Sequence, residues 1–216
     1  MIQLHHSPGT AAMVPHILLE EIGVPYERVH VDRLASGHKT PQYLRLNPNG
    51  LIPVLTDGGL VLYETAAIAL HLCDTNPQAA LAPALGSDER AHFYKWLMWL
   101  TNTLQAALKI YFYPERWLEE GNEGGVAQLK SHAESQIGGM LDQLDAELAR
   151  HGGPWFAGKH YSALDAYVFT LCRWTRNFKS PPARSRPHLG PYLQRMLERA
   201  AVQRVIANEK LVPPLV

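Results

Sequence analysis

The hydrophobic pattern of this 216-residue chain changes once, near residue 80. Before that point short β-like runs alternate with helical ones, and the order is IQLH, MVPHILLEEIG, YERVHVD, IPVLT and LVLYE. From Asp88 onward we find only long helical patterns and no convincing strand. This division predicts a mixed α/β domain over residues 1–77, a linker rich in Pro, Ala and Gly over 78–87, and an all-helical domain over 88–216.

The individual elements are predicted from the spacing of apolar residues and from the turn-forming residues between them. The first two strands enclose a helix, and the turn DGG joins the last two strands as a hairpin. A further helix begins near Glu64 and ends before Pro77. In the second domain the spacing predicts helices over residues 89–112, 125–150, 163–178 and 191–209.

Charge and cysteine content exclude several classes of protein. Twenty basic residues balance twenty acidic ones, so no overall field favours nucleic acid or an anionic membrane surface as a partner. Cys73 and Cys172 lie in apolar helical segments, where a free thiol is usually a small buried hydrophobic group. No export signal or membrane-spanning run is found, and we expect a cytoplasmic protein.

Four motifs resemble one family. They are SPG at residues 7–9 after the first strand, NPNGLIPVL at 47–55, YETAAI at 63–68, and FAGKHYSALDAYVF at 156–169. In this order they resemble the soluble glutathione S-transferases, and most closely the bacterial beta class. The resemblance implies an α/β N-terminal thioredoxin-like domain, an all-α C-terminal helical domain, glutathione as co-substrate and a homodimer formed by the helices after Glu64 and within Asp88–Tyr113.

The resemblance also implies the residues that bind glutathione. Pro53 stands where the family keeps a cis-proline, which leaves the N–H and C=O of Ile52 to pair with the peptide as an added strand would. Glu64 and Thr65 match the family's Glu-Ser pair at a helix start, where a carboxylate is favoured. His38 and Lys39 match a region that reaches over the ligand, and Lys39 is the stronger candidate.

The sulfur site departs from the beta class. The places of its tyrosine and cysteine are held by His5 and Thr10, and loss of the cysteine removes mixed-disulfide chemistry. A hydroxyl donor to the thiolate then becomes the expected mechanism, with Ser7 and Thr10 as candidate catalytic residues. Ser7 equally suits the N-cap of the first helix. On the long helix, the beta-class Asn and His-Lys positions read Met98, Gln105 and Ala106.

Three other patterns have structural explanations. Ser162 and Asp165 form Ser-x-x-Asp before an apolar run, which predicts a capping box. The aromatic residues between Phe93 and Trp117 fill a core or, where they face the first domain, line an apolar pocket. His5 and His6 point to opposite faces of a strand and have no partners at zinc-ligand spacing, so we expect no metal.

These observations favour an enzyme of detoxification type that conjugates glutathione to a small hydrophobic electrophile. Two alternatives stay open: a non-enzymatic member of the fold that binds glutathione or a protein partner, and a glutathione-dependent isomerase or reductase.

Overall fold

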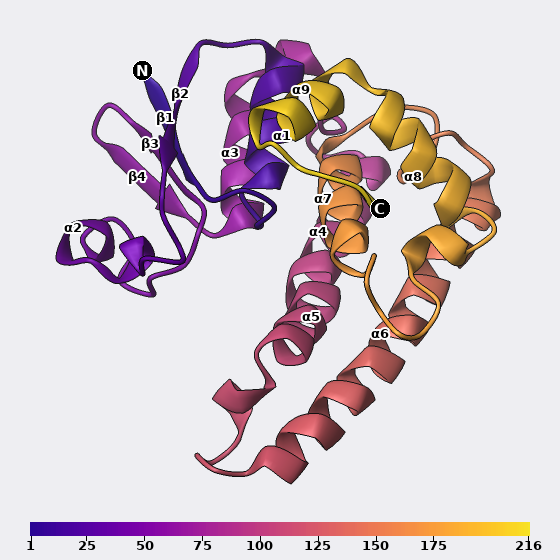
Figure 1. Cartoon of the computed structure of the whole chain (residues 1–216). Coiled ribbons are helices and arrows are strands. Elements are labelled where there is room, and N and C mark those ends of the chain that lie inside the picture. The colour runs from indigo at the N-terminus through magenta and orange to yellow at the C-terminus, as the bar shows by residue number, and fades with distance from the viewer.

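The computed structural model describes all 216 residues, and two structural regions follow each other along the chain (Figure 1). The strands are β1 (Ile2–His6), β2 (Tyr26–His30), β3 (Val54–Asp57) and β4 (Leu60–Tyr63). The helices are α1 (Met13–Ile22), α2 (Pro41–Leu44), α3 (Thr65–Thr75), α4 (Asp88–Trp99), α5 (Gln105–Phe112), α6 (Glu123–His151), α7 (Ala163–Trp174), α8 (Leu189–Glu198) and α9 (Ala200–Asn208).

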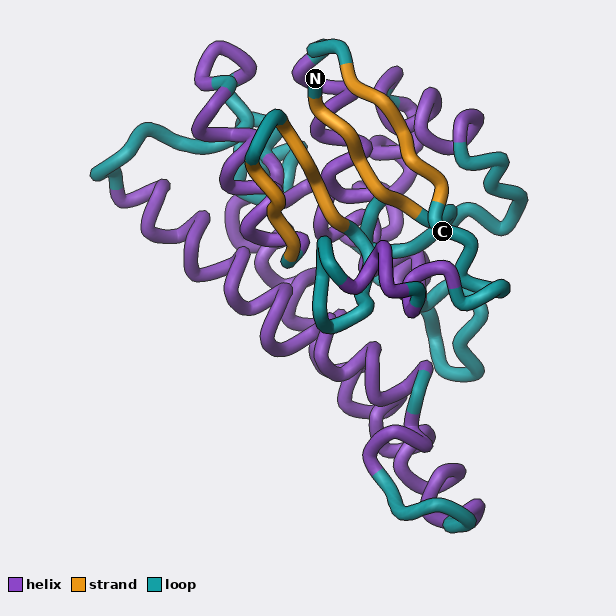
Figure 2. Tube along the Cα trace, turned by 90° about the vertical axis from the view of Figure 1, so that its left-hand side faces the viewer, coloured by secondary structure: helices purple, strands orange, loops and turns teal.

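The four strands form one mixed sheet in the order β2-β1-β3-β4 (Figure 2). β1 pairs with β2 in parallel, which requires a crossover through α1, whereas β1–β3 and β3–β4 are antiparallel. The two-residue connection between β3 and β4 places Gly58 at a φ of 57°, a conformation that glycine adopts without steric cost. Together with the helical second region, this sheet confirms the predicted thioredoxin-like fold class.

Helices α1 and α3 lie together against one face of the sheet and join it to the second region (Figure 1). Residues Met13–Leu19 of α1 are all buried, because the sheet, α3, α7 and α9 enclose this helix. The opposite face carries α2, whose Tyr43 packs in a small separate cluster with Val31 and Val54. Both faces of the sheet are therefore covered by helices.

The second region is helical throughout, apart from one isolated bridge between Trp155 and Gly158. α7 runs through its centre, with every residue from Ala163 to Arg173 buried. The predicted helix over 89–112 is interrupted by a π-helical segment, Leu100–Leu104, between α4 and α5. α6 packs against α5 and extends with it away from the sheet (Figure 1).

The prediction of a single helix over 191–209 is wrong. Arg199 is extended, with φ −68° and ψ 131°, and separates α8 from α9. Its guanidinium donates to both carboxylate oxygens of Glu21 and stands 3.7 Å from the ring centroid of Tyr161. These contacts, of which the one with Glu21 joins the two regions, compensate for ending one helix and starting another.

The predicted capping box and buried cysteines are confirmed. The N–H of Ser162 donates to the carboxylate of Asp165 over 2.8 Å, at the start of α7. Cys73 and Cys172 are free and buried, and burial raises the pKa of the Cys73 thiol to about 12. None of the helices has both the length and the apolar character needed to cross a membrane.

Candidate functional site

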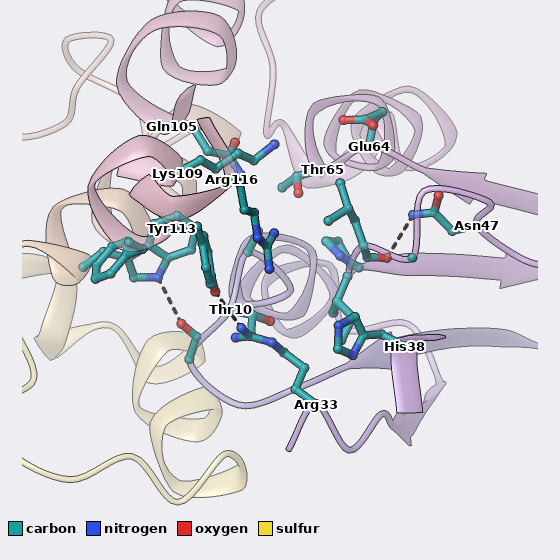
Figure 3. A pocket seen from close by; sticks show the side chains of 18 of the residues that line it. Thr10, Arg33, His38, Asn47, Glu64, Thr65, Gln105, Lys109, Tyr113 and Arg116 are labelled. Carbon is teal, nitrogen blue, oxygen red and sulfur yellow. Dashed lines mark hydrogen bonds between the residues drawn. The ribbon is translucent and has the colours of Figure 1, made fainter. Parts of the chain in front are cut away.

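A cleft of about 510 Å³ lies between the loops of the sheet and the helices α5 and α7 (Figure 3). It brings together seven of the eight predicted site residues: Thr10, His38, Lys39, Ile52, Pro53, Glu64 and Thr65. The eighth, Ser7, does not line it. The other lining residues are Gly9, Ala11, Arg33, Asn47, Gly50, Leu51, Gln105, Lys109, Phe112, Tyr113, Arg116, Trp117, Trp174 and Arg176.

One wall of the cleft is the segment that leads into β3. The Ile52–Pro53 peptide bond is cis, and neither the N–H nor the C=O of Ile52 makes a hydrogen bond within the chain. The preceding carbonyl, that of Leu51, accepts from the amide of buried Asn47 over 2.9 Å and from the Tyr43 hydroxyl over 2.8 Å. These bonds fix the segment and leave the polar groups of Ile52 available to a ligand.

The N-terminus of α3 forms a second side of the cleft. Glu64 occupies the N-cap position with a φ of 72°, and its side chain makes no capping hydrogen bond. Thr65, the first residue of the helix, is buried and lines the cleft. An uncapped helix start presents unpaired N–H groups, which favour a carboxylate, while the exposed carboxylate of Glu64 suits a cation.

The first loop supplies Thr10 and Ala11. The Thr10 hydroxyl donates to the carbonyl of Ser7 over 2.7 Å, so it turns outward only by exchanging that bond. The N–H of Ala11 makes no hydrogen bond within the chain, and Ala11 also lines the cleft. The N-cap of α1 is Ala12, so the capping hypothesis for Ser7 is wrong; the role of Ser7 here is to accept from Thr10 through its carbonyl.

Residues from the far end of the chain hold this loop in place. The N–H of Gly9 donates to Glu209 over 2.7 Å, and the carbonyl of Gly9 accepts from the Trp174 indole over 3.0 Å. The other carboxylate oxygen of Glu209 lies 2.7 Å from Nδ1 of His16, and both side chains are fully buried. Both backbone polar groups of Gly9, the residue before Thr10, are thus fixed by side chains of the second region.

A turn at residues 37–39 closes the cleft above Gly50. A Cβ at Gly50 would stand 2.9 Å from the carbonyl oxygen of His38 and 2.7 Å from Nζ of Lys39, and its φ is 57°. Only glycine allows the turn to approach this closely. Burial, together with the charges of Lys39, Arg33 and Arg116, lowers the pKa of His38, so its ring adds no charge here at neutral pH.

The helical side contributes Lys109 and Arg116, which the sequence did not single out for the site, and Tyr113, one of the aromatic residues expected in a core or an apolar pocket. Lys109, Tyr113 and Arg116 come from α5 and the turn after it, and follow Gln105 at steps of four or three residues, a spacing that places them on one face. That spacing is a signal that sequence reasoning missed. Arg33 and Arg176 come from isolated loop positions and have no such local signal.

The predicted aromatic run divides between core and cleft. Phe93, Trp96 and Tyr111 are buried in the core, whereas Phe112, Tyr113 and Trp117 line the cleft with Trp174. Gln105 is also buried at the cleft wall, where its carbonyl oxygen accepts from the Tyr167 hydroxyl over 2.5 Å. The cleft therefore has a polar end, at the segment before β3 and the start of α3, and an aromatic end beyond Thr10 (Figure 3).

Known proteins match this chain over nearly its whole length. Residues 1–74 match the glutathione S-transferase N-terminal domain and residues 100–200 the C-terminal domain. Glutathione S-transferase GST-4.5 of Xanthomonas campestris is 30% identical over 210 residues, which are 97% of this chain and 100% of that protein.

Two solved structures show the same arrangement. A glutathione transferase homologue from Sulfitobacter with bound glutathione superposes with a TM-score of 0.89 at 25% identity, covering 98% of this chain and 99% of that one. A bacterial beta-class glutathione S-transferase from Sphingomonas chungbukensis gives 0.83 at 32% identity, covering 97% of this chain and 100% of its own. With the sheet order, the cis-proline segment and the helical second region, these matches place the chain in the soluble glutathione S-transferase family.

Proposed function

We propose that this protein is a glutathione transferase that activates the thiol of glutathione for attack on a small electrophile. The observation that carries the proposal is the unpaired backbone of Ile52 beside the uncapped start of α3, with Glu64 at that start and Thr10 across the cleft. This arrangement offers an extended tripeptide main-chain partners, a carboxylate site, an ammonium site and a donor for sulfur.

In this proposal each part of glutathione has its own partner. The cysteinyl unit pairs with the N–H and C=O of Ile52 as a short added strand. The γ-glutamyl carboxylate accepts from Thr65 and the helix start, while Glu64 accepts from the α-ammonium. Lys39, with Nζ 3.5 Å from the carbonyl of Asn49, reaches the glycyl carboxylate.

The sulfur then lies near Thr10 and Ala11. A thiol with an ordinary pKa of about 8.5 is mostly protonated at neutral pH, so a donor that prefers the thiolate increases the reactive fraction. The Thr10 hydroxyl and the free N–H of Ala11 are two such donors, and the tethers on Gly9 keep both in position.

The electrophile lies at the aromatic end of the cleft. The thiolate sulfur forms a bond to carbon, the leaving group departs with the electron pair of its own bond, and the proton of the thiol passes to solvent. The product is a thioether, and no oxidant or reductant takes part. Phe112, Tyr113, Trp117 and Trp174 offer flat apolar surface for a small aromatic or unsaturated compound.

We further propose a cytoplasmic homodimer with a role in detoxification. Two free, buried thiols are consistent with a reducing compartment. Tyr94 and Met98 of α4 keep 38% and 43% of their surface exposed, within the predicted interface helices. A solution mass near twice the 24.2 kDa of the chain supports the dimer, and a monomer mass contradicts it.

The test of the function compares wild type, Thr10→Ala, Thr10→Ser and Ser7→Ala in conjugation of chlorodinitrobenzamide, a neutral aryl chloride. Loss of a hydrogen bond to a charged sulfur predicts a fall of about tenfold to a hundredfold in kcat for Thr10→Ala, with glutathione affinity retained. Thr10→Ser and Ser7→Ala keep the wild-type rate. Glutathione binding without thioether formation contradicts the enzyme and favours a non-enzymatic member, and regenerated glutathione indicates an isomerase.

A further inference from the structure

The cleft carries a strong excess of positive charge. Five Lys and Arg side chains line it and only one carboxylate does, that of Glu64, although the chain as a whole has a formal net charge of zero. None of the five cations makes an ion pair with any carboxylate. The five are Arg33, Lys39, Lys109, Arg116 and Arg176.

Three of these five cations lie at the aromatic end of the cleft and not at the polar end where glutathione is proposed to bind. The Arg33 guanidinium donates to the Tyr113 hydroxyl over 2.6 Å, and Cζ of Arg116 stands 4.1 Å from the centroid of the same ring. Figure 3 shows Arg116 directed into the cleft above Thr10. Arg176 is half-buried without an acidic partner, and burial lowers its pKa. Three guanidiniums thus border the aromatic end.

Glutathione alone leaves this charge unbalanced. The peptide brings two carboxylates, one ammonium and, when ionised, one thiolate, and its ammonium faces Glu64. Lys39 serves the glycyl carboxylate, and the start of α3 serves the γ-glutamyl one. Like charges gathered in a partly enclosed cleft repel one another, and a further anion removes that repulsion. Guanidiniums beside aromatic rings suit a planar acid, because they bind carboxylates in a fork and rings by stacking.

We propose that the preferred electrophile is itself an anion: a planar aromatic or unsaturated compound whose carboxylate, or similar acidic group, binds to Arg116 and Arg176 with Arg33 nearby. The inference rests on the proposed function and gives its substrate class. At an aromatic ring the carbon–sulfur bond forms and the leaving group departs with the electron pair of its own bond. At an activated double bond the carbon–sulfur bond forms as the π bond breaks, and the neighbouring carbon takes a proton from solvent. The acidic group takes no part beyond binding.

The test uses a matched pair of substrates, chlorodinitrobenzoate and chlorodinitrobenzamide. Both carry chlorine para to the carbonyl group and between two nitro groups, and chloride leaves from each. Each kcat/KM is divided by the uncatalysed rate constant with glutathione, which removes intrinsic reactivity. We expect this normalised value to favour the carboxylate by about tenfold or more in wild type, since charge-assisted bonds hold only that substrate.

Charge-removal variants locate the effect. Arg116→Gln and Arg176→Gln each lower the carboxylate-to-amide ratio by about threefold to tenfold, and the double variant lowers it further. Lys159→Gln is the matched control, because Lys159 is exposed, contacts no charged partner and lies outside the cleft. It leaves the ratio at the wild-type value. A cation that only stabilises the thiolate changes kcat/KM by the same factor for both substrates, so its effect cancels in the carboxylate-to-amide ratio.

Two results overturn the inference. The first is a wild-type ratio of about one or below while the amide is conjugated normally, which leaves the proposed function intact. The second is a clear preference for the carboxylate that neither arginine variant reduces. If neither substrate is conjugated, the proposed function fails, and the anion site is then tested by calorimetric titration with dinitrobenzoate and with dinitrobenzamide. Equal affinities for the two compounds overturn the anion site. A preference for the acid that Arg116→Gln removes supports the anion site.

Discussion

At the scale of single residues, the backbone of Glu64 is the clearest sign of a constraint other than stability. A side chain at a φ of 72° is strained, and glycine would adopt this conformation more easily. The strain falls on the residue that places a carboxylate beside an uncapped helix start. This strained position is consistent with a role of Glu64 in ligand binding that lowers folding stability.

This argument predicts that two substitutions of Glu64 differ in stability but not in glutathione binding. Glu64→Gly and Glu64→Ala both remove the carboxylate, so both weaken glutathione binding alike. Glu64→Gly is the more stable of the two by about 1 kcal/mol, because only it relieves the strained backbone. Urea unfolding of the pair measures the difference; an alanine variant as stable as the glycine variant contradicts the strain.

The free energy of unfolding depends on pH through His6. Burial, with the charges of His16, Arg28 and His30, lowers the pKa of His6 to about 4, despite the opposing effect of Glu209. As pH falls from about 6.5, the unfolded chain binds a proton at this position while the folded one stays neutral down to about 4. The free energy of unfolding therefore decreases through this window, by roughly 2 kcal/mol from His6 alone.

His6→Phe tests this contribution. Asp165 acts in the opposite sense, because burial raises its pKa to about 6, so the folded state binds that proton first. It is present in both proteins and cancels in their difference. Relative to wild type, His6→Phe gains stability between about pH 7 and about pH 4.5 in urea unfolding. Parallel pH profiles for the two proteins contradict the assignment.

At the scale of elements, α7 depends on the carboxylate of Asp165. This side chain is fully buried and accepts from the N–H of Phe156 over 2.7 Å, from the N–H of Ser162 over 2.8 Å and from the Tyr192 hydroxyl over 3.0 Å. An ordinary cap contributes roughly 1 kcal/mol. Asp165 also joins α7 to α8 and to the turn before it, so its loss leaves several buried donors unpaired.

Asp165→Ala is therefore expected to cost about 3 kcal/mol or more of unfolding free energy. Asp88→Ala is the matched control, because Asp88 also lies in the first turn of a helix but is exposed; it changes stability by about 0.5 kcal/mol or less. Thermal or urea unfolding measures both. Equal effects of the two substitutions would show that Asp165 is only a local cap.

How far the sequence predicts an element or site residue depends on how local its cause is. The spacing of Ser162 and Asp165 alone indicates a capping box, and the cleft residues from Ile52 to Thr65 lie in the short motifs that carry the family resemblance. Arg199 breaks the last helix because of contacts with Glu21 and Tyr161, which no local pattern contains. Arg33 and Arg176 reach the cleft only through the packing of the two regions, so composition shows a neutral chain where the structure shows a basic cleft.

At the scale of the whole molecule, a residue near the C-terminus fixes the loop that follows the first strand. Glu209 follows α9, yet it accepts from Gly9 in the loop between β1 and α1 and pairs with His16 of α1. The packing of α9 against α1 brings these groups together in a buried site. The geometry around Thr10 therefore depends on both structural regions.

Glu209→Ala is predicted to lower the free energy of unfolding by about 3 kcal/mol, because it leaves the N–H of Gly9 and the ring of His16 without their buried partner. It also lowers kcat for conjugation, since the loop that positions Thr10 loses a tether. Glu198→Ala, an exposed acid at the end of α8, is the control and alters neither quantity. A Glu209→Ala protein of wild-type stability contradicts the coupling.

The most direct test of the central claim is calorimetric titration of glutathione into wild type, Glu64→Gln and Glu198→Gln at neutral pH. We predict that wild type and Glu198→Gln bind alike, and that Glu64→Gln binds at least about tenfold more weakly, because the charged partner of the ammonium is lost. No binding by wild type, or equal binding by all three proteins, would contradict the assignment of this cleft as the glutathione site.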